Sequence, residues 1–108
     1  MRIFSVRDAK AETYMTPFFL RNTAMAIRSF TDAVLDESTP IGKYPEDYAL
    51  FEIGGFDEFT GEVEVQLPYC VCKAFDVIPL DHAGNVRVQE LRDASAARGP
   101  REATKETA

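Results

Sequence analysis

The sequence predicts an α+β protein in which one α-helix packs on a small antiparallel β-sheet, followed by a disordered C-terminal tail. Between Glu62 and Leu67, polar and apolar side chains alternate strictly, which is the period of a strand with one buried face. Residues 23–35 instead repeat apolar side chains at spacings of three and four, which is typical of an amphipathic helix. Residues 93–108 contain no large apolar side chain, so we expect a polar, disordered tail after a single β-rich domain over residues 1–92.

Two short strands are expected before the helix. Apolar side chains alternate weakly around Ile3 and Val6, which favours a first strand over residues 2–7. Residues 8–16 are mixed and polar, typical of a loop or an irregular crossover. A proline followed by the apolar run 18–20 predicts a second strand, because proline is tolerated at the first position of a strand.

The helix should begin after a capping residue and end near Leu35. Asn22 and Thr23 both have side chains that can accept a hydrogen bond from the first turn. The apolar stripe consists of three side chains, Ile27, Phe30 and Val34. We expect this stripe to face the sheet.

A loop over residues 41–47 should precede a β-hairpin. Its first strand can place three side chains on the face toward the helix, Ala49, Phe51 and Ile53. The connecting loop ends in Gly61, which suits the positive φ that closes a longer hairpin loop. Pro68 should break the second strand.

The sequence specifies less beyond Pro68. Residues 69–78 form another apolar stretch, residues 81–85 predict a turn, and residues 86–91 a last short strand. No segment is apolar and long enough for a signal peptide or a membrane span, so we expect a soluble protein with no membrane contact.

Charge is distributed unevenly along the chain. The net charge is −6, but residues 1–22 carry four cations against two carboxylates, whereas residues 23–69 carry two cations against ten. Such a chain would not coat a nucleic acid by bulk electrostatics, because counterion release needs clustered cations. Any nucleic-acid contact must use a local patch, and the acidic middle can equally serve as a solvated face.

No pattern of catalytic residues is visible. Cys70, Cys72 and His82 supply three nominal zinc ligands without a fourth, so free, partly buried thiols, an exposed histidine and no metal are expected. The pair Gly54 and Gly55 neither precedes a helix nor comes with a lysine, so it predicts a bulge or the close approach of another chain rather than a phosphate-binding loop. We therefore expect a protein that is not an enzyme and has no cofactor.

The remaining constellation combines cations and aromatic rings. Aromatic residues interleaved with cations on a small sheet can stack single-stranded bases and hold phosphates. The candidate nucleic-acid-binding residues are Arg2, Arg7, Lys10, Tyr14, Phe18, Arg21 and Arg28, with Phe19 beside them. The alternative is that Phe18 and Phe19 straddle the sheet, one of them in the core, while the cations only solvate an edge.

The chain resembles the small nonstructural protein of microviruses, the gokushovirus-like single-stranded DNA phages. The residues that carry this resemblance are, in order, Arg2-Ile3-Phe4-Ser5-Val6, Asp8, Lys10-Ala11, Tyr14, Pro17-Phe18-Phe19, Ala26-Ile27-Arg28-Ser29-Phe30, Pro45-Glu46-Asp47, Leu50-Phe51-Glu52-Ile53-Gly54, Asp57 and Gly61.

The resemblance implies an accessory role in the bacterial host cytoplasm, in the switch from double-stranded replicative DNA to single-stranded genome synthesis and packaging. It implies partners among phage proteins such as the replication initiator, and single-stranded DNA. It carries no catalytic residues. From the residues alone, a protein-binding or self-assembling module without nucleic-acid contact stays open.

Self-association is also expected. A domain this small buries little surface, and a small sheet leaves an open edge. Gly54 and Gly55 have no side chain that would block a neighbouring copy, so we expect a homo-oligomer.

Overall fold

The computed structural model describes residues 1–79, of which Met1–Val77 form one compact unit. The elements in order are β1 (Arg2–Asp8), β2 (Thr13–Tyr14), β3 (Phe18–Leu20), α1 (Thr23–Leu35), α2 (Pro40–Lys43), the 3-10 helix η1 (Pro45–Asp47), β4 (Tyr48–Phe56), β5 (Val63–Lys73) and the 3-10 helix η2 (Ala74–Val77). The α+β class with one main helix on an antiparallel sheet is confirmed. The predicted turn at 81–85, strand at 86–91, domain end at residue 92 and tail at 93–108 lie outside the described residues.

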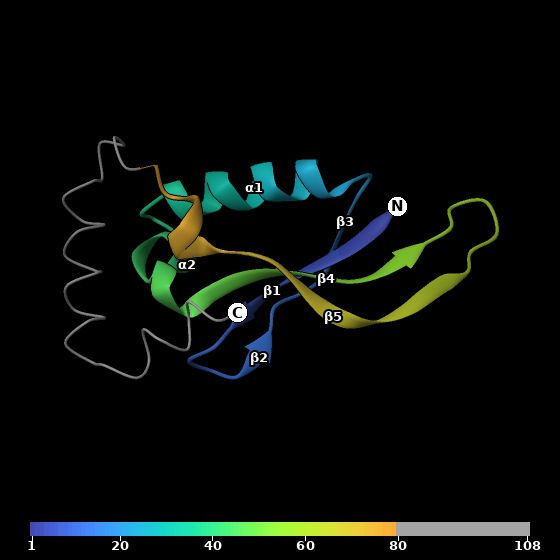
Figure 1. Cartoon of the computed structure of the whole chain (residues 1–108), viewed down its shortest axis with the longest axis horizontal. Helices are drawn as coiled ribbons and strands as arrows, with labels where there is room; N and C mark the ends of the chain where they lie inside the picture. The colour runs from blue at the N-terminus through green and yellow to red at the C-terminus, as the bar shows by residue number, and fades with distance from the viewer. Residues whose placement is uncertain (80–108) are drawn as a thin grey trace. The chain divides into compact units, whose positions relative to one another are not determined.

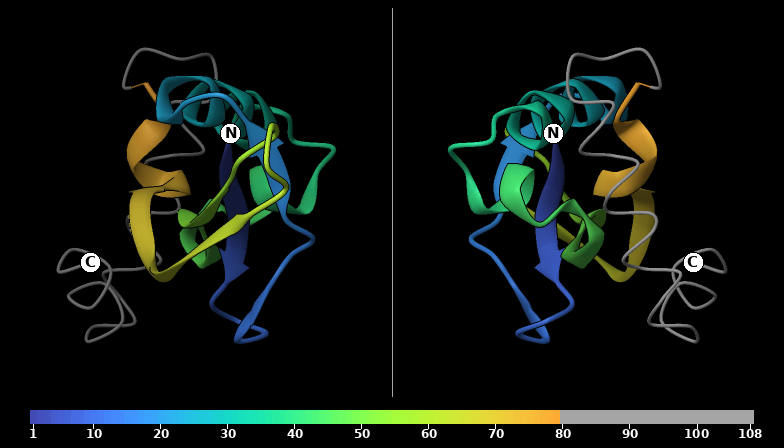
Figure 2. Two further views of the ribbon diagram at one scale, coloured as in Figure 1. Left: turned by 90° about the vertical axis from the view of Figure 1, so that its right-hand side faces the viewer. Right: turned by 90° about the vertical axis from the view of Figure 1, so that its left-hand side faces the viewer.

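The sheet has the order β2-β1-β4-β5, and β3 pairs with the same edge of β1 as β2 does. All of these pairs are antiparallel. Figures 1 and 2 show α1 lying along one face of the sheet, while the β4–β5 hairpin continues past the end of the helix. Residues 8–16, predicted as a loop, include the two-residue strand β2.

The core lies between α1 and the sheet. Along β1, Phe4 and Val6 alternate with Ser5, and all three are buried. Ser5 is satisfied on the other face, where its hydroxyl donates to the Met15 carbonyl at 2.6 Å. The buried apolar residues of the unit are Ile3, Phe4, Val6, Ala26, Phe30, Val34, Ile41, Leu50, Ala74 and Phe75.

Helix α1 has the bounds that the sequence predicts. Asn22 is the N-cap, and its side chain accepts a hydrogen bond from the Met25 N–H at 2.9 Å. Phe30 and Val34 of the predicted stripe are buried, as is Ala26, whereas Ile27 is half-buried.

The loop predicted over residues 41–47 is instead helical. Thr39 caps α2 by accepting from the Gly42 N–H at 3.0 Å, and Pro40 occupies the first helical turn, where its missing N–H costs nothing. A second proline, Pro45, opens the 3-10 helix η1. Local capping therefore gives this segment structure that its composition does not predict.

Strand β4 lies between β1 and β5 and is irregular. The pairing with β5 shifts register between Leu50 and Phe51 and again between Glu52 and Gly54. In the pairing with β1, Leu50 lies opposite Val6 and is fully buried, whereas Phe51 lies opposite Ser5 on the other face and is half-buried, so the prediction that Phe51 faces the helix core is wrong. Ile53 is half-buried and has no cross-strand partner in β1 or β5.

Strand β5 is the edge of the sheet that residues 1–79 form, and it differs from prediction in two ways. It continues through Pro68 to Lys73, although no residue from Gln66 to Pro68 is paired with β4. A proline is compatible with an edge strand because its ring replaces an outward N–H. The apolar side chains of the alternating run are exposed rather than half-buried: Val63 by 61%, Val65 by 91% and Leu67 by 88%.

Gly54 and Gly55 lie beside a bulge in β4, but they do not lie at an open edge of the sheet. A bulge adjoins Gly54, as predicted. Both glycines lie inside the sheet, however, because β4 is flanked by β1 and β5. A Cβ at Gly55 would lie 2.6 Å from Nη1 of Arg2, so the close approach is made by this chain, and the prediction that the pair marks an edge open to a second copy is wrong.

Candidate nucleic-acid interface

Arg7 and Tyr14 form a cation–aromatic pair on the face of the sheet opposite α1. They occupy paired positions in β1 and β2, so their side chains project to the same face. The Arg7 guanidinium carbon lies 5.9 Å from the centre of the Tyr14 ring. Arg7 makes no ion pair within residues 1–79, and Tyr14 is 44% exposed. This pair is open to a ligand.

Phe51 supports the Tyr14 ring from the neighbouring strand. The two rings meet edge to face with their centres 5.5 Å apart. Phe51 pairs with Ser5 in β1, two residues from Arg7 on the same face. From the sequence, Phe51 is predicted to lie in the core. Only the pairing of β1 with β4 shows that its ring instead packs against Tyr14.

Lys10 lies in the turn between β1 and β2. The Asp8 side chain accepts from the backbone N–H groups of Lys10 at 3.0 Å and Ala11 at 3.2 Å, which holds the turn. Burial, and after it the negative charge of the same carboxylate, raise the pKa of the Tyr48 phenol. Lys10 itself is exposed and makes no ion pair within the described chain. We call Arg7, Lys10 and Tyr14 the β1–β2 patch.

Arg2 is held by acceptors on β4 and β5. Its Nη2 donates to Glu52 and to Gln66, each at 2.8 Å, and its Nη1 donates to Glu64 at 3.1 Å. The hydrogen bond that Arg2 donates to Glu52, followed by the one it donates to Glu64, raises the pKa of Arg2. Its charge is neutralised inside the molecule.

The other candidates are also dispersed. Arg21 pairs with Glu58 at 3.2 Å, and Arg28 lies on the exposed side of α1. Phe18 stacks on the buried Phe4 ring at 5.9 Å, while its neighbour Phe19 is 48% exposed. Phe18 and Phe19 therefore straddle the sheet. The structure places Arg7 beside Tyr14, with Lys10 in the turn that joins their strands, and places Arg2, Phe18, Arg21 and Arg28 elsewhere.

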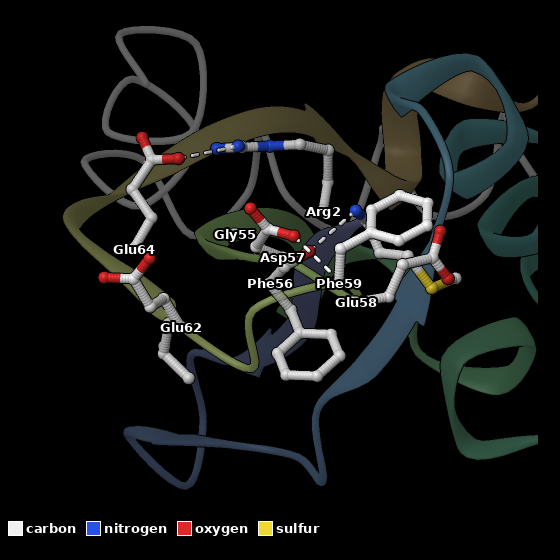
Figure 3. Close-up of a pocket in the computed structure, with 10 residues that line it drawn as sticks. Arg2, Gly55, Phe56, Asp57, Glu58, Phe59, Glu62 and Glu64 are labelled. Atoms are coloured by element: carbon white, nitrogen blue, oxygen red, sulfur yellow. Dashed lines mark hydrogen bonds and ion pairs between the residues drawn. The ribbon is translucent and has the colours of Figure 1, made fainter.

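An acidic hollow occupies the end of the β4–β5 hairpin. It has a volume of about 550 Å³ and is lined by Arg2 and by four carboxylates, those of Asp57, Glu58, Glu62 and Glu64. Figure 3 shows the Arg2 side chain reaching Glu64 across one side, with the Phe59 ring nearby. This acidic end of the protein would repel a phosphate backbone.

The two cysteines are free and half-buried, as the sequence predicts. Burial raises the pKa of Cys70, and raises that of Cys72 to about 11, so neither thiol is activated as a nucleophile. Within residues 1–79, no group of three or more His, Cys, Asp or Glu side chains could hold a metal ion. No helix in that part of the chain is long and apolar enough to cross a membrane.

These features define a small α+β protein with one cation–aromatic patch and an acidic hairpin. The family model described as Phage ORF5 protein matches residues 1–77, and the chain belongs to this phage family. This confirms the resemblance at the level of a phage protein. No curated protein and no solved structure matches the chain.

Proposed function

We propose that this protein is a non-enzymatic accessory factor of microvirus type, acting in the synthesis or packaging of single-stranded phage DNA in the host cytoplasm. It contacts single-stranded DNA weakly through the β1–β2 patch, or works through a phage protein such as the replication initiator. Membership of a phage family supports the setting. The observation that carries the DNA contact is the Arg7 guanidinium lying over the exposed Tyr14 ring without a carboxylate partner in the described residues.

The chemistry of this pair suits a single strand. An unpaired base stacks on an exposed ring, and a neighbouring guanidinium and ammonium hold the flanking phosphates. Only Arg7 and Lys10 offer cations at the patch, and residues 23–69 carry ten carboxylates against two cations. Binding should therefore be weak and dependent on salt, with a slope of about 0.7 per phosphate contact.

The test is fluorescence anisotropy of the whole chain with a labelled single-stranded oligonucleotide at two salt concentrations. Arg7→Gln should weaken binding and flatten the salt dependence. Arg28→Gln is the control, since it removes an exposed cation of α1, away from the patch, and should leave both the affinity and its salt dependence nearly unchanged. No binding of the wild type at low salt, or equal losses in the two variants, would remove the DNA contact.

A protein partner is the second candidate, and the exposed apolar run of β5 favours it. Val63, Val65 and Leu67 project into solvent from an edge strand, where a module without nucleic-acid contact would bind another chain. Binding to the replication initiator that survives nuclease treatment and Arg7→Gln would support this route over DNA.

A further inference from the structure

We infer that β5 pairs with β5 of a second copy of this chain, antiparallel about a two-fold axis at Val65, so that two sheets join into one. The inference concerns an interface and does not depend on the proposed DNA contact. It rests on the direction of the β5 backbone groups, on the exposure of its side chains, and on the self-complementary order of residues 62–68.

Within residues 1–79, the outer edge of β5 has backbone hydrogen-bonding groups without a partner strand. The N–H of Phe56 donates to the Met1 carbonyl at 2.8 Å, and the Met1 amine donates to the Phe56 carbonyl at 2.9 Å. Both polar groups of Phe56 thus point away from β5, which makes Phe56 and Val63 a non-hydrogen-bonded pair. The N–H and C=O of Val63 then point outward, and by alternation those of Val65 do too.

The usual protections of an edge strand are missing from this stretch. Natural edges are blocked by lysines, inward-pointing charges or prolines. Here Pro68 ends the stretch that lacks these protections. Between Val63 and Leu67 the three apolar side chains are exposed on one face. The two polar side chains between them, Glu64 and Gln66, project to the opposite face. There Glu64 and Gln66 bind Arg2. An unblocked strand with an apolar side is a template for another strand.

The order of residues selects a second copy as the occupant. An axis at Val65 places Val65 opposite its own copy, Val63 opposite Leu67, and Glu64 opposite Gln66. Glu62 then lies opposite Pro68. Apolar side chains meet apolar ones, and each Glu64 meets an amide, whose Nε2 has a second N–H beside the one it donates to the Glu52 carbonyl.

Neighbouring registers are worse. An axis at Glu64 would place that carboxylate directly opposite its copy, which is destabilising in a cross-strand pair. An axis at Gln66 would place Glu64 opposite Pro68 and leave the exposed Val63 beyond the paired stretch. A twin strand would give Val63, Val65 and Leu67 the apolar cross-strand neighbours that the described residues do not supply.

The test is sedimentation equilibrium of the full chain over micromolar to submillimolar concentrations. The wild type should dimerise. Val65→Lys and Val65→Asp should each raise the dimer dissociation constant by about 100-fold, because each places two like charges at the axis. Mixing the two variants should restore a heterodimer, which misfolded variants would not do. Phe59→Lys, at a 92% exposed site in the hairpin loop outside the paired stretch, is the control and should dimerise normally.

Hydrogen exchange tests the backbone part separately. The Val63 and Val65 amides should be protected at high concentration and should lose that protection on dilution or in Val65→Lys. A wild type that stays monomeric throughout overturns the inference. A dimer that persists in Val65→Lys, or one without protection of these amides, also overturns it.

Discussion

Arg2 and Gly55 lie opposite each other in β1 and β4, and the Arg2 guanidinium passes over the place where a side chain at position 55 would begin. Glu64 of β5 completes this row, and Arg2 reaches its carboxylate across the glycine. A sheet position is thus left without a side chain so that one cation can bridge three strands.

The two glycines should differ sharply when replaced by alanine. At Gly54 the new Cβ would lie 2.7 Å from the backbone carbonyl oxygen of Glu64, so a strand must move, and we expect a loss of about 1–3 kcal/mol. At Gly55 the Cβ would meet only the side-chain tips of Arg2 and Glu64, which can shift; the net effect should stay within about 1 kcal/mol. Denaturant unfolding of both variants checks this order, and equal losses would contradict it.

The two arginine ion pairs should also differ. Arg2→Gln removes the partner of Glu52, whose side chain is only 18% exposed, and should cost about 1–2 kcal/mol in the free energy of unfolding. Arg21→Gln breaks a pair in which the arginine is 70% exposed and should cost no more than about 0.5 kcal/mol. The comparison is made by urea unfolding at moderate salt. A loss in Arg2→Gln no larger than that in Arg21→Gln would contradict a stabilising role for the Arg2 bridge.

Phe30 should dominate the helix–sheet contact. It is 3% exposed and borders the same small cavity as Val6, Phe18 and Ile41. Phe30→Ala should destabilise the fold by about 3–5 kcal/mol, enough to unfold much of so small a unit. Met25→Ala on the same helix removes a side chain that is 46% exposed and should change stability by less than about 0.5 kcal/mol. Thermal melts of the two variants that coincide would show that the stripe is not the core.

Cys72 should make stability depend on pH in the alkaline range. Burial raises its pKa from 9.0 to about 11, so between these values the unfolded chain has lost a proton that the folded chain keeps. Its contribution is fully present below about pH 9 and is lost as the pH rises toward 11. The stability difference between wild type and Cys72→Ser should therefore shrink over this interval, measured by unfolding at pH 8 and 10.5. A difference that does not change with pH would contradict the burial of the thiol.

The sequence was most informative where structure is set locally. The bounds of α1 follow from the Asn22 cap and from Phe30 and Val34 at helical spacing, all within one segment. The strands around Val6 and Phe19 were likewise predicted from their own residues. In α2, by contrast, the helix begins at a capping threonine although the composition of the segment is typical of a loop. The pattern of apolar residues gives no sign of this cap.

Long-range pairing explains the rest. Arg2 and Arg21 look as available as Arg7 in the sequence, but their carboxylates come from positions 64 and 58. The alternation along β5 predicts one polar and one apolar face. It does not predict that the apolar side chains Val63, Val65 and Leu67 are left exposed. Arg7 and Tyr14 do lie side by side in the structure, because only a short hairpin separates them.

The last prediction concerns the aromatic part of the β1–β2 patch. If Tyr14 stacks a base, Tyr14→Ala should weaken single-stranded DNA binding by about 1–3 kcal/mol, whereas Tyr14→Phe keeps the ring and should bind almost as the wild type does. Phe19→Ala is the control, because Phe19 is an exposed ring on β3 that packs on Phe56, away from Arg7. Anisotropy titrations at one low salt concentration measure all three. If Phe19→Ala lowers the affinity as much as Tyr14→Ala does, DNA does not bind specifically at the patch. If Tyr14→Ala binds with unchanged affinity, only Arg7 and Lys10 contact the DNA, through its phosphates.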